Sequence, residues 1–373
     1  MNFSALDAFA WREVGQVYTR KGEFHRAIEA FTAAIEVIPD DPELFLLRGQ
    51  AFFERRELDS ALTNFDRAIE SAPDCMEAWG RRAEALLAKG DFAGALRDFT
   101  KVIELDPKWA GGWNGRGTVY AQSGHPRQAL RDYSEALRRQ PDAVATLLNR
   151  GRIHKTLGLH AEASADFSGA IRYDPRNPEG YTARAEMLAL LGRVDAALSD
   201  LNTVLRLDPR QPDAFWLRAN LHHRNLDLEK AVEDLSWLLK LRPEDVDAWN
   251  LRGCLRSEAH DVAGAVQDHE RARSIDPSHP NTLNYLAWIR ATAADPRIFE
   301  PEQALADARR ACEITRWEMA GFLDTLAAAC AANGLFDEAA ATQEKALDIA
   351  GEELQAELRG RLVCYRHRKA YRV

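Results

Sequence analysis

Residues 113–141 of this chain read WNGRGTVYAQSGHPRQALRDYSEALRRQP, and the same spaced residues return every 34 positions above and below this stretch. Its aromatic and small side chains twice follow the spacing i, i+4, i+7, which places residues on one face of a helix. These two sets are Trp113, Gly117 and Tyr120, then Ala129, Tyr133 and Ala136. Between them lies Gly124, and glycine readily adopts the left-handed conformation that ends many helices. The stretch therefore predicts a hairpin of two helices.

Prolines show the period most clearly, because they recur every 34 residues without a slip: Pro39, Pro73, Pro107, Pro141, Pro175, Pro209, Pro243 and Pro277. When the repeats are aligned at this period, equivalent residues form columns. One column holds only alanine, and another holds only glycine or alanine. Small columns let two antiparallel helices approach closely, and a larger side chain there would overpack the hairpin by about 1 to 3 kcal/mol. Each hairpin leaves one apolar face bare, so we expect successive hairpins to stack on one another.

The first unit carries Trp11, Val14, Gly15, Tyr18, Ala27, Phe31, Ala34 and Pro39. This pattern resembles the signature W-x2-L-G-x2-Y…A-x3-F…P of the tetratricopeptide repeat (TPR) family. The resemblance extends over nearly the whole chain. It implies an all-α fold, a right-handed α-solenoid of about ten TPR helix hairpins with a C-terminal capping helix.

We expect residues 1–373 to form a single TPR solenoid, with repeats that start near residues 8, 42, 76, 110, 144, 178, 212, 246, 280 and 320. After Pro277 the second helix resumes at Ala304, five residues later than the period predicts. Residues 352–373 are predicted to form a closing helix. The region from Leu283 onward is similar to the C-terminal module of many bacterial TPR proteins, and that similarity implies an end cap.

Composition and charge exclude several function classes. The chain has 373 residues, with 49 Lys plus Arg against 58 Asp plus Glu and a net charge of −9, which argues against a nucleic-acid or anionic membrane surface. The N-terminus lacks the pattern of a signal peptide, and no run of 18 apolar residues occurs, so we expect a soluble cytoplasmic protein. Five scattered cysteines form no CxxC pair, so we expect no metal and no cofactor.

A second pattern consists of charged residues at fixed positions. Units two to eight carry an arginine in the first helix: Arg48, Arg82, Arg116, Arg150, Arg184, Arg218 and Arg252. Units three to nine carry an aspartate in the second helix: Asp98, Asp132, Asp166, Asp200, Asp234, Asp268 and Asp307. We interpret them as ion pairs within the stack, with a phosphate-binding stripe as the alternative. Pairing within one hairpin leaves Arg48 opposite Asn64 and Leu286 opposite Asp307. Pairing with the following repeat avoids both mismatches but needs a longer reach, so we favour the same or an adjacent hairpin.

The resemblance assigns ligand binding to the concave face, which is lined by exposed positions of the first helices. The predicted binding residues on this face are Trp216, Asn220, His223, Arg224, Asn250, Asn284, Arg152 and Lys155. Charge alternates along these positions, which suits an extended peptide of mixed charge, although such charges are more often a solvated face. Asn250 and Asn284 lie one period apart, and their amides could hold a peptide backbone. For Asn284 and its neighbour Trp288, packing in the C-terminal module is the favoured alternative.

Nothing in the sequence supports catalysis. The ten histidines occur without an HExxH motif, and no glycine-rich loop follows a strand. We therefore predict a protein–protein interaction scaffold, not an enzyme, which binds an extended peptide or partner helix in the concave groove. The alternatives are a self-assembling structural protein or a regulatory subunit that docks on an enzyme. The expected partner is a protein or peptide, and the sequence does not decide the oligomeric state.

Overall fold

The structure is a computed structural model of the chain, and it describes residues 5–372. This part of the chain contains 21 helices and no strand. Clustering of contacts divides the chain into two compact units, Met1–Ala197 and Leu198–Val373, and the division falls inside α12 (Val194–Leu207). The expectation of a single solenoid over residues 1–373 stays a prediction.

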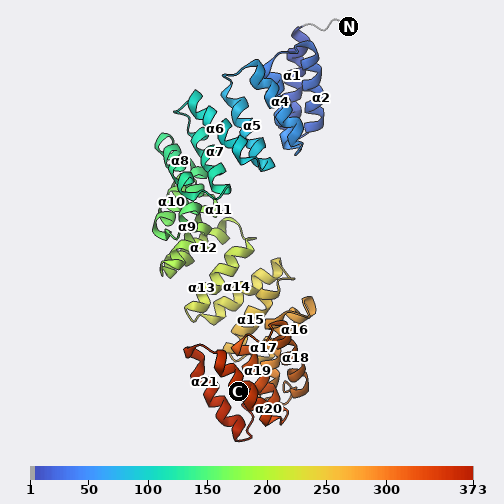
Figure 1. Cartoon of the computed structure of the whole chain (residues 1–373), viewed down its shortest axis with the longest axis vertical. Helices are drawn as coiled ribbons and strands as arrows, with labels where there is room; N and C mark the ends of the chain where they lie inside the picture. The colour runs from blue at the N-terminus through green and yellow to red at the C-terminus, as the bar shows by residue number, and fades with distance from the viewer. Residues whose placement is uncertain (1–4, 373) are drawn as a thin grey trace. The chain divides into compact units, whose positions relative to one another are not determined.

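In the first unit, helices of similar length follow one another along the chain, separated by short turns (Figure 1). They are α1 (Ala5–Arg20), α2 (Phe24–Val37), α3 (Pro42–Glu54), α4 (Leu58–Ser71), α5 (Met76–Lys89), α6 (Phe92–Leu105), α7 (Ala110–Gln122), α8 (Pro126–Arg139), α9 (Val144–Thr156), α10 (His160–Tyr173) and α11 (Pro178–Leu190). Each odd-numbered helix from α1 to α9 pairs with the even-numbered helix that follows it, and the next hairpin packs on that pair.

The second unit contains α13 (Pro212–Arg224), α14 (Leu228–Leu241), α15 (Val246–Glu258), α16 (Val262–Ile275), α17 (Pro280–Thr292), α18 (Pro301–Ile314), α19 (Ala320–Ala332), α20 (Phe336–Ile349) and α21 (Glu352–Arg366). Hairpins form between α13 and α14, α15 and α16, α17 and α18, and α19 and α20, and α21 packs on α20. The prediction of an all-α solenoid is confirmed.

Glycines in the small column make room for an aromatic ring of the second helix. A Cβ atom at Gly15 would lie 2.4 Å from the ring of Phe31, and one at Gly151 would lie 2.5 Å from the ring of Phe167. Both rings are fully buried. The close approach of the two helices in a hairpin therefore depends on these glycines, because a packed aromatic ring cannot retreat.

The turns between paired helices keep one conformation even where glycine is missing. Gly90 has φ +84°, and Arg56, Leu226 and His260 adopt the same left-handed region with φ between +60° and +64°. A non-glycine residue pays about 1 kcal/mol for this conformation. At these three turns the packing of the repeat therefore outweighs the preference of non-glycine residues for a negative φ.

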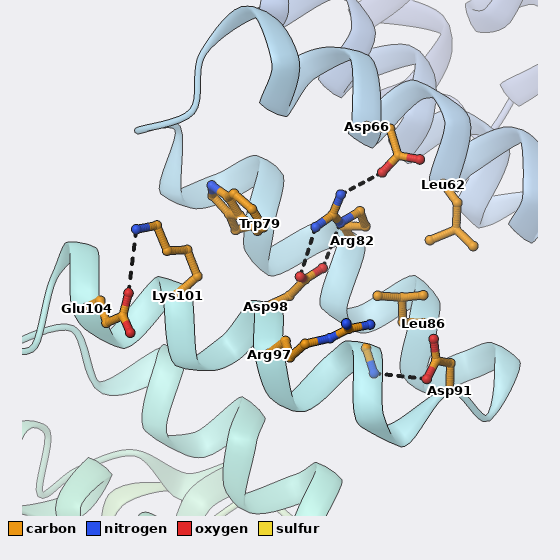
Figure 2. Close-up of a pocket in the computed structure, with 11 residues that line it drawn as sticks. Leu62, Asp66, Trp79, Arg82, Leu86, Asp91, Arg97, Asp98, Lys101 and Glu104 are labelled. Carbon is orange, nitrogen blue, oxygen red and sulfur yellow. Dashed lines mark hydrogen bonds and ion pairs between the residues drawn. The ribbon is translucent and has the colours of Figure 1, made fainter.

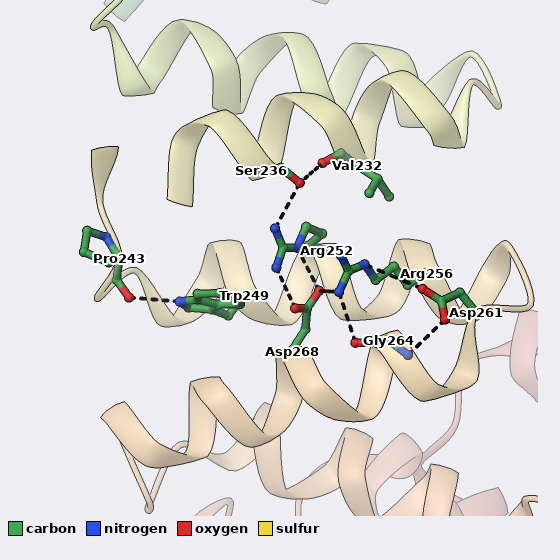
Figure 3. Close-up of polar contacts among 9 residues, drawn as sticks. All are labelled: Val232, Ser236, Pro243, Trp249, Arg252, Arg256, Asp261, Gly264 and Asp268. Atoms are coloured by element: carbon green, nitrogen blue, oxygen red, sulfur yellow. Dashed lines mark hydrogen bonds and ion pairs between the residues drawn. The ribbon is translucent and has the colours of Figure 1, made fainter. Parts of the chain in front are cut away.

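Aromatic residues and prolines recur together because they are bonded to each other. The indole Nε1 of Trp79 donates to the carbonyl oxygen of Pro73 at 2.9 Å, and Trp249 does the same to Pro243 at 3.0 Å (Figure 3). The proline ends the preceding turn, and its carbonyl is fixed by the side chain of the next first helix. This bond joins consecutive hairpins.

The arginines pair with the aspartate of their own hairpin, 16 residues later. The pairs in which the Nε and Nη2 atoms both reach the carboxylate are Arg82–Asp98, Arg116–Asp132, Arg150–Asp166, Arg218–Asp234 and Arg252–Asp268. In the second hairpin Arg48 donates to the amide oxygen of Asn64 at 2.8 Å, so asparagine takes the place of the carboxylate. Since these charges satisfy one another, the ion-pair interpretation is supported over a phosphate-binding stripe.

The remaining arm of each arginine reaches back to the preceding hairpin. Its Nη1 atom donates to a polar side chain of the preceding second helix, 16 residues before the arginine, at Thr32, Asp66, Thr100, Ser134, Ser168, Asn202 or Ser236. Figure 3 shows Arg252 between Ser236 of α14 and Asp268 of α16. Arg48, Arg82, Arg116, Arg150, Arg218 and Arg252 therefore each connect their own second helix to the second helix before it.

The hairpin of α17 and α18 keeps this connection through a different residue. Leu286 stands where the arginine is expected, and Arg290, one helical turn later, contacts both Asp307 and Glu270. Glu270 lies one period after Ser236, in the column of back-reaching acceptors. The mismatch between Leu286 and Asp307 is therefore compensated inside α17 itself.

The C-terminal helix α21 covers the end of the stack with apolar contacts and one buried ion pair. Tyr365 is fully buried and Leu358 is 1% exposed. Asp324 of α19 accepts a hydrogen bond from Arg361 at 2.8 Å and another from Gln343 at 2.7 Å. This arrangement is that of an end cap. The helix ends at Arg366, short of the predicted limit at residue 373.

Candidate partner-binding surfaces

Four of the predicted binding residues lie on α13, at i, i+4, i+7 and i+8. Trp216 is half-buried against the core of its hairpin, and Asn220 donates to the carbonyl oxygen of Trp216 at 2.8 Å. The side chain of His223 is 35% exposed and lies 3.1 Å from Glu258 of α15. Arg224 is exposed and has no hydrogen bond or ion pair with any described residue. The structure therefore brings these four residues together at the surface.

Asn250 does not share this surface, because it is buried with only 4% exposed. Its Nδ2 atom donates to Thr282 at 2.7 Å, and its Oδ1 atom lies 3.0 Å from Nδ1 of His269. Both ends of the amide are occupied within the protein, as buried polar groups require. Asn250 in this structure fastens α15 to α16 and α17 and does not face a ligand.

His269 is the residue that the sequence interpretation missed. It stands in the column that holds Phe31, Phe65 and Phe167 in other repeats. It is 1% exposed, and its ring stacks on Tyr285 with centroids 5.0 Å apart. Burial lowers the pKa of His269 to about 4, so the ring is neutral at pH 7 and can donate to the Asn250 amide. The signal for it was the break in an aromatic column.

We predict that His269 makes the stability of its hairpin depend on pH. The pKa falls from 6.5 in the unfolded chain to about 4 in the folded one, so the unfolded state binds more protons between these values. Stability is full above pH 6.5, and about 3 kcal/mol is lost as the pH falls from 6.5 to 4. Hydrogen exchange at α15 and α16 should show this loss, and His269→Phe should reduce it. An unchanged pH profile in that variant would refute the assignment.

Trp288 packs within the C-terminal module, and Asn284, one helical turn before it, is half-buried. The Oδ1 atom of Asn284 is buried and has no hydrogen-bond partner among the described residues. The ring of Trp288 packs on Tyr371 at 5.9 Å between centroids, and the Arg361 guanidinium lies 5.3 Å from the Trp288 ring. These contacts favour the packing alternative for Trp288.

Arg152 and Lys155 lie on α9 in the first unit and are exposed. Arg152 pairs with Glu179 of α11, and Lys155 pairs with Glu186 of the same helix. The alternation of charge noticed in the sequence therefore reflects pairs between neighbouring first helices. Exposed pairs of this kind contribute about 0 to 1 kcal/mol, so a charged ligand can replace them at little cost.

A cavity of about 550 Å³ opens on the first unit between α4, α5 and α6 (Figure 2). Its lining is Leu62, Asp66, Trp79, Arg82, Leu86, Asp91, Gly94, Arg97, Asp98, Lys101 and Glu104. Arg82 is held there by Asp66 and Asp98, and the carboxylate of Asp91 accepts from the Gly94 amide at 2.9 Å. Most polar groups in this cavity are already engaged with one another, and no sequence pattern had predicted the cavity.

Within residues 5–372 no group of three or more His, Cys, Asp or Glu side chains is placed to hold a metal ion. In the same range no helix combines the length and the apolar character that a membrane span requires.

The amino-acid sequence matches family models of helical repeats. A family model described as tetratricopeptide repeat matches residues 46–108, 114–178, 148–212, 183–235 and 216–280. A second model, described as TPR repeat, matches residues 15–55. These matches cover more than half of the chain. The chain belongs to the tetratricopeptide repeat family. The TPR signature seen in the first unit therefore identified the family correctly.

Solved TPR structures resemble the chain at low identity. A TPR protein from Parabacteroides merdae has 20% identity and a TM-score of 0.49, with 63% of this chain and 93% of that chain covered. The Pseudomonas aeruginosa protein pilF has 17% identity and a TM-score of 0.48, covering 57% and 96%. TTC0263 from Thermus thermophilus has 26% identity and a TM-score of 0.39, covering 48% and 98%. Comparison with curated proteins gave no match.

Proposed function

We propose that this TPR protein is an interaction scaffold that binds an extended peptide or a partner helix on the exposed face of α13, within the concave groove that the TPR fold forms. Membership of the family supports a role in protein–protein interaction. The observation that carries the finer proposal is the surface formed by Trp216, Asn220, His223 and Arg224, in which the arginine has no partner among the described residues.

Physical reasons favour this surface over the other exposed positions. Tryptophan and arginine are the residues most enriched at the energetic centres of interfaces, because each combines apolar area with a directional polar group. Trp216 is anchored by its packing in the hairpin, so little side-chain entropy is lost when a partner covers it. An acidic residue of the partner would satisfy Arg224 with a charge-assisted hydrogen bond.

The neighbouring helix α15 adds an acidic group beside this surface. Glu258 contacts His223 at 3.1 Å, and both side chains are at least one-third exposed. A partner with a basic residue next to its acidic one could exchange this pair for its own contacts. The surface therefore suits a segment of mixed charge with one apolar anchor.

Affinity capture from the native lysate tests the proposal with three forms of the protein. We expect the double variant Trp216→Ala/Arg224→Ala to retain its fold and to lose at least about tenfold in binding, which corresponds to 1.4 kcal/mol. Lys240→Ala on the exposed face of α14 is the matched control and should capture the same partners as the wild type. Identical partners and yields from the double variant and the wild type would contradict the α13 site.

The alternative functions predicted from the sequence are compatible with this proposal. A regulatory subunit that docks on an enzyme would act through the same binding surface. The absence of catalysis and the cytoplasmic location stay predictions.

A further inference from the structure

The first helix exposes an apolar face that no described part of the chain covers. In α1 Trp11, Val14 and Val17 follow one another three residues apart on one face, with exposed fractions of 40%, 37% and 41%. Phe9 is 56% exposed on another side of the helix, against the guanidinium of Arg12. A cluster of exposed apolar side chains on one helix therefore points to a contact with another surface.

In later repeats, several of the residues equivalent to those of the α1 face are buried. Val17 shares its column with Ala51, Ala85 and Val119, each of which is fully buried. Trp11 shares its column with Phe45, which is 6% exposed. In those repeats the preceding even-numbered helix covers the face, as α2 covers α3 and α4 covers α5. The face of α1 therefore has the composition of a covered face, although no residue of the part that the structure describes covers it.

The residue type at Val14 indicates that the surface covering α1 differs from the second helix of a preceding repeat. Val14 occupies the column in which units two to eight carry the arginine that reaches back to a polar side chain of the preceding second helix. An arginine at Val14 would need such an acceptor in the covering surface. Its replacement by an apolar residue indicates a cover without that acceptor.

We propose that a second copy of this chain covers α1, with the two α1 helices antiparallel and a two-fold axis near Val14. A residue on a two-fold axis meets its own copy, so an arginine there would face another arginine, whereas two valines pack together. Residues on either side of the axis exchange partners, so Trp11 of one copy lies beside Val17 of the other.

The charges of α1 fit this arrangement. Asp7 stands in the first turn, Arg20 stands in the last turn, and Lys21 follows the helix. Antiparallel pairing places the acidic start of each helix next to the basic end of the other, and a parallel pairing would place like charges together. Two copies of this face therefore match each other in an antiparallel arrangement, both in the order of their apolar residues and in the charges at the helix ends.

The contact involves one helix from each copy, so the dimer is expected to be weak and reversible, as small interfaces are. Sedimentation equilibrium over a concentration series up to about 0.1 mM covers the affinity range of such interfaces. We expect the average mass of the full-length protein to rise toward twice that of one chain as the concentration increases. The test uses no other partner, so its result is independent of the α13 proposal.

Two variants place the contact on α1. Val14→Arg and Val17→Lys change exposed positions, so the fold should persist, which circular dichroism checks. Each should weaken dimerisation by more than about tenfold, since it introduces charge repulsion or buries an unpaired charge. Leu190→Lys, at a leucine that is 60% exposed on α11, is the control and should dimerise as the wild type does. A monomeric wild type would overturn the proposal, as would folded α1 variants that dimerise normally.

Discussion

Replacing Asp268 by alanine is expected to destabilise the α15–α16 hairpin by about 3 to 5 kcal/mol, the cost of leaving a buried charge without its partner. Asp268 is 2% exposed and accepts hydrogen bonds from Arg252 at 2.8 and 2.7 Å. It also contacts Arg256 at 3.0 Å (Figure 3). The variant removes the carboxylate that both guanidinium groups contact. The effect should extend to α14, because Arg252 also binds Ser236.

Hydrogen exchange is the suitable measurement for Asp268→Ala, because unfolding in repeat proteins need not be two-state and the method reports each helix separately. Protection of the α15 and α16 amides should fall by at least about a hundredfold, which corresponds to 2.7 kcal/mol. Arg252→Met/Asp268→Leu is the informative control, since replacing both members of a buried pair by apolar groups is often nearly neutral. In this variant Arg256 keeps its contacts with Asp261 and with the carbonyl oxygen of Gly264. Equal losses in the single and double variants would show that packing, not the unpaired charge, sets the cost.

Replacing Tyr365 by alanine is expected to release the C-terminal cap, with a loss of about 3 to 5 kcal/mol for a fully buried aromatic side chain. Tyr365 lies in the core cluster formed with α19 and α20 and has no exposed surface. Without it α21 loses its largest contact, and the Asp324–Arg361 pair that lies beside it becomes open to water.

The hydroxyl of Tyr365 provides a matched control for this variant. It is buried and makes no hydrogen bond to any described residue, and burial raises the pKa of Tyr365. Tyr365→Phe removes only this unsatisfied group, so its stability should equal or exceed that of the wild type by up to about 1 kcal/mol. Thermal unfolding of the full chain compares the two variants. A destabilised Tyr365→Phe protein would mean that the hydroxyl has a partner, such as a bound water.

The fold was predictable because the residues that determine it recur. Gly15 and Phe31 are constrained by direct contact, and Trp79 is constrained by its bond to the Pro73 carbonyl. A contact that repeats in space leaves a repeated spacing in the sequence, and eight copies of the spacing exclude chance. The ion pairs followed the same logic, although their backward reach to residues such as Ser236 required the structure.

The candidate site was less predictable because a single sequence does not show exposure at positions that depart from the repeat. Asn250 was expected on the binding face, yet it is buried, as Leu46 and Leu148 of the same column are, and its amide contacts Thr282 and His269. Arg290 replaces an arginine missing one turn earlier. Both arrangements join residues from different helices, so neither produces a local motif.

The charges on α9 illustrate a second limit of sequence interpretation. Arg152 and Lys155 formed a basic spot between acidic residues, which suited a ligand of mixed charge. In the structure these charges pair with Glu179 and Glu186, so their alternation describes contacts within the protein. Arg224 differs because no described residue neutralises it, and for this reason the α13 surface carries the proposal.

Site-specific photo-crosslinking in the native cell tests the proposed binding surface most directly. A photoreactive residue at Asn220 on α13 is compared with one at Glu233, an exposed position on α14. We predict a discrete crosslinked protein partner from position 220, absent from position 233 and lost when Arg224→Ala is added. A partner that crosslinks from position 233 and not from position 220, or one that is unaffected by Arg224→Ala, would contradict binding at this surface.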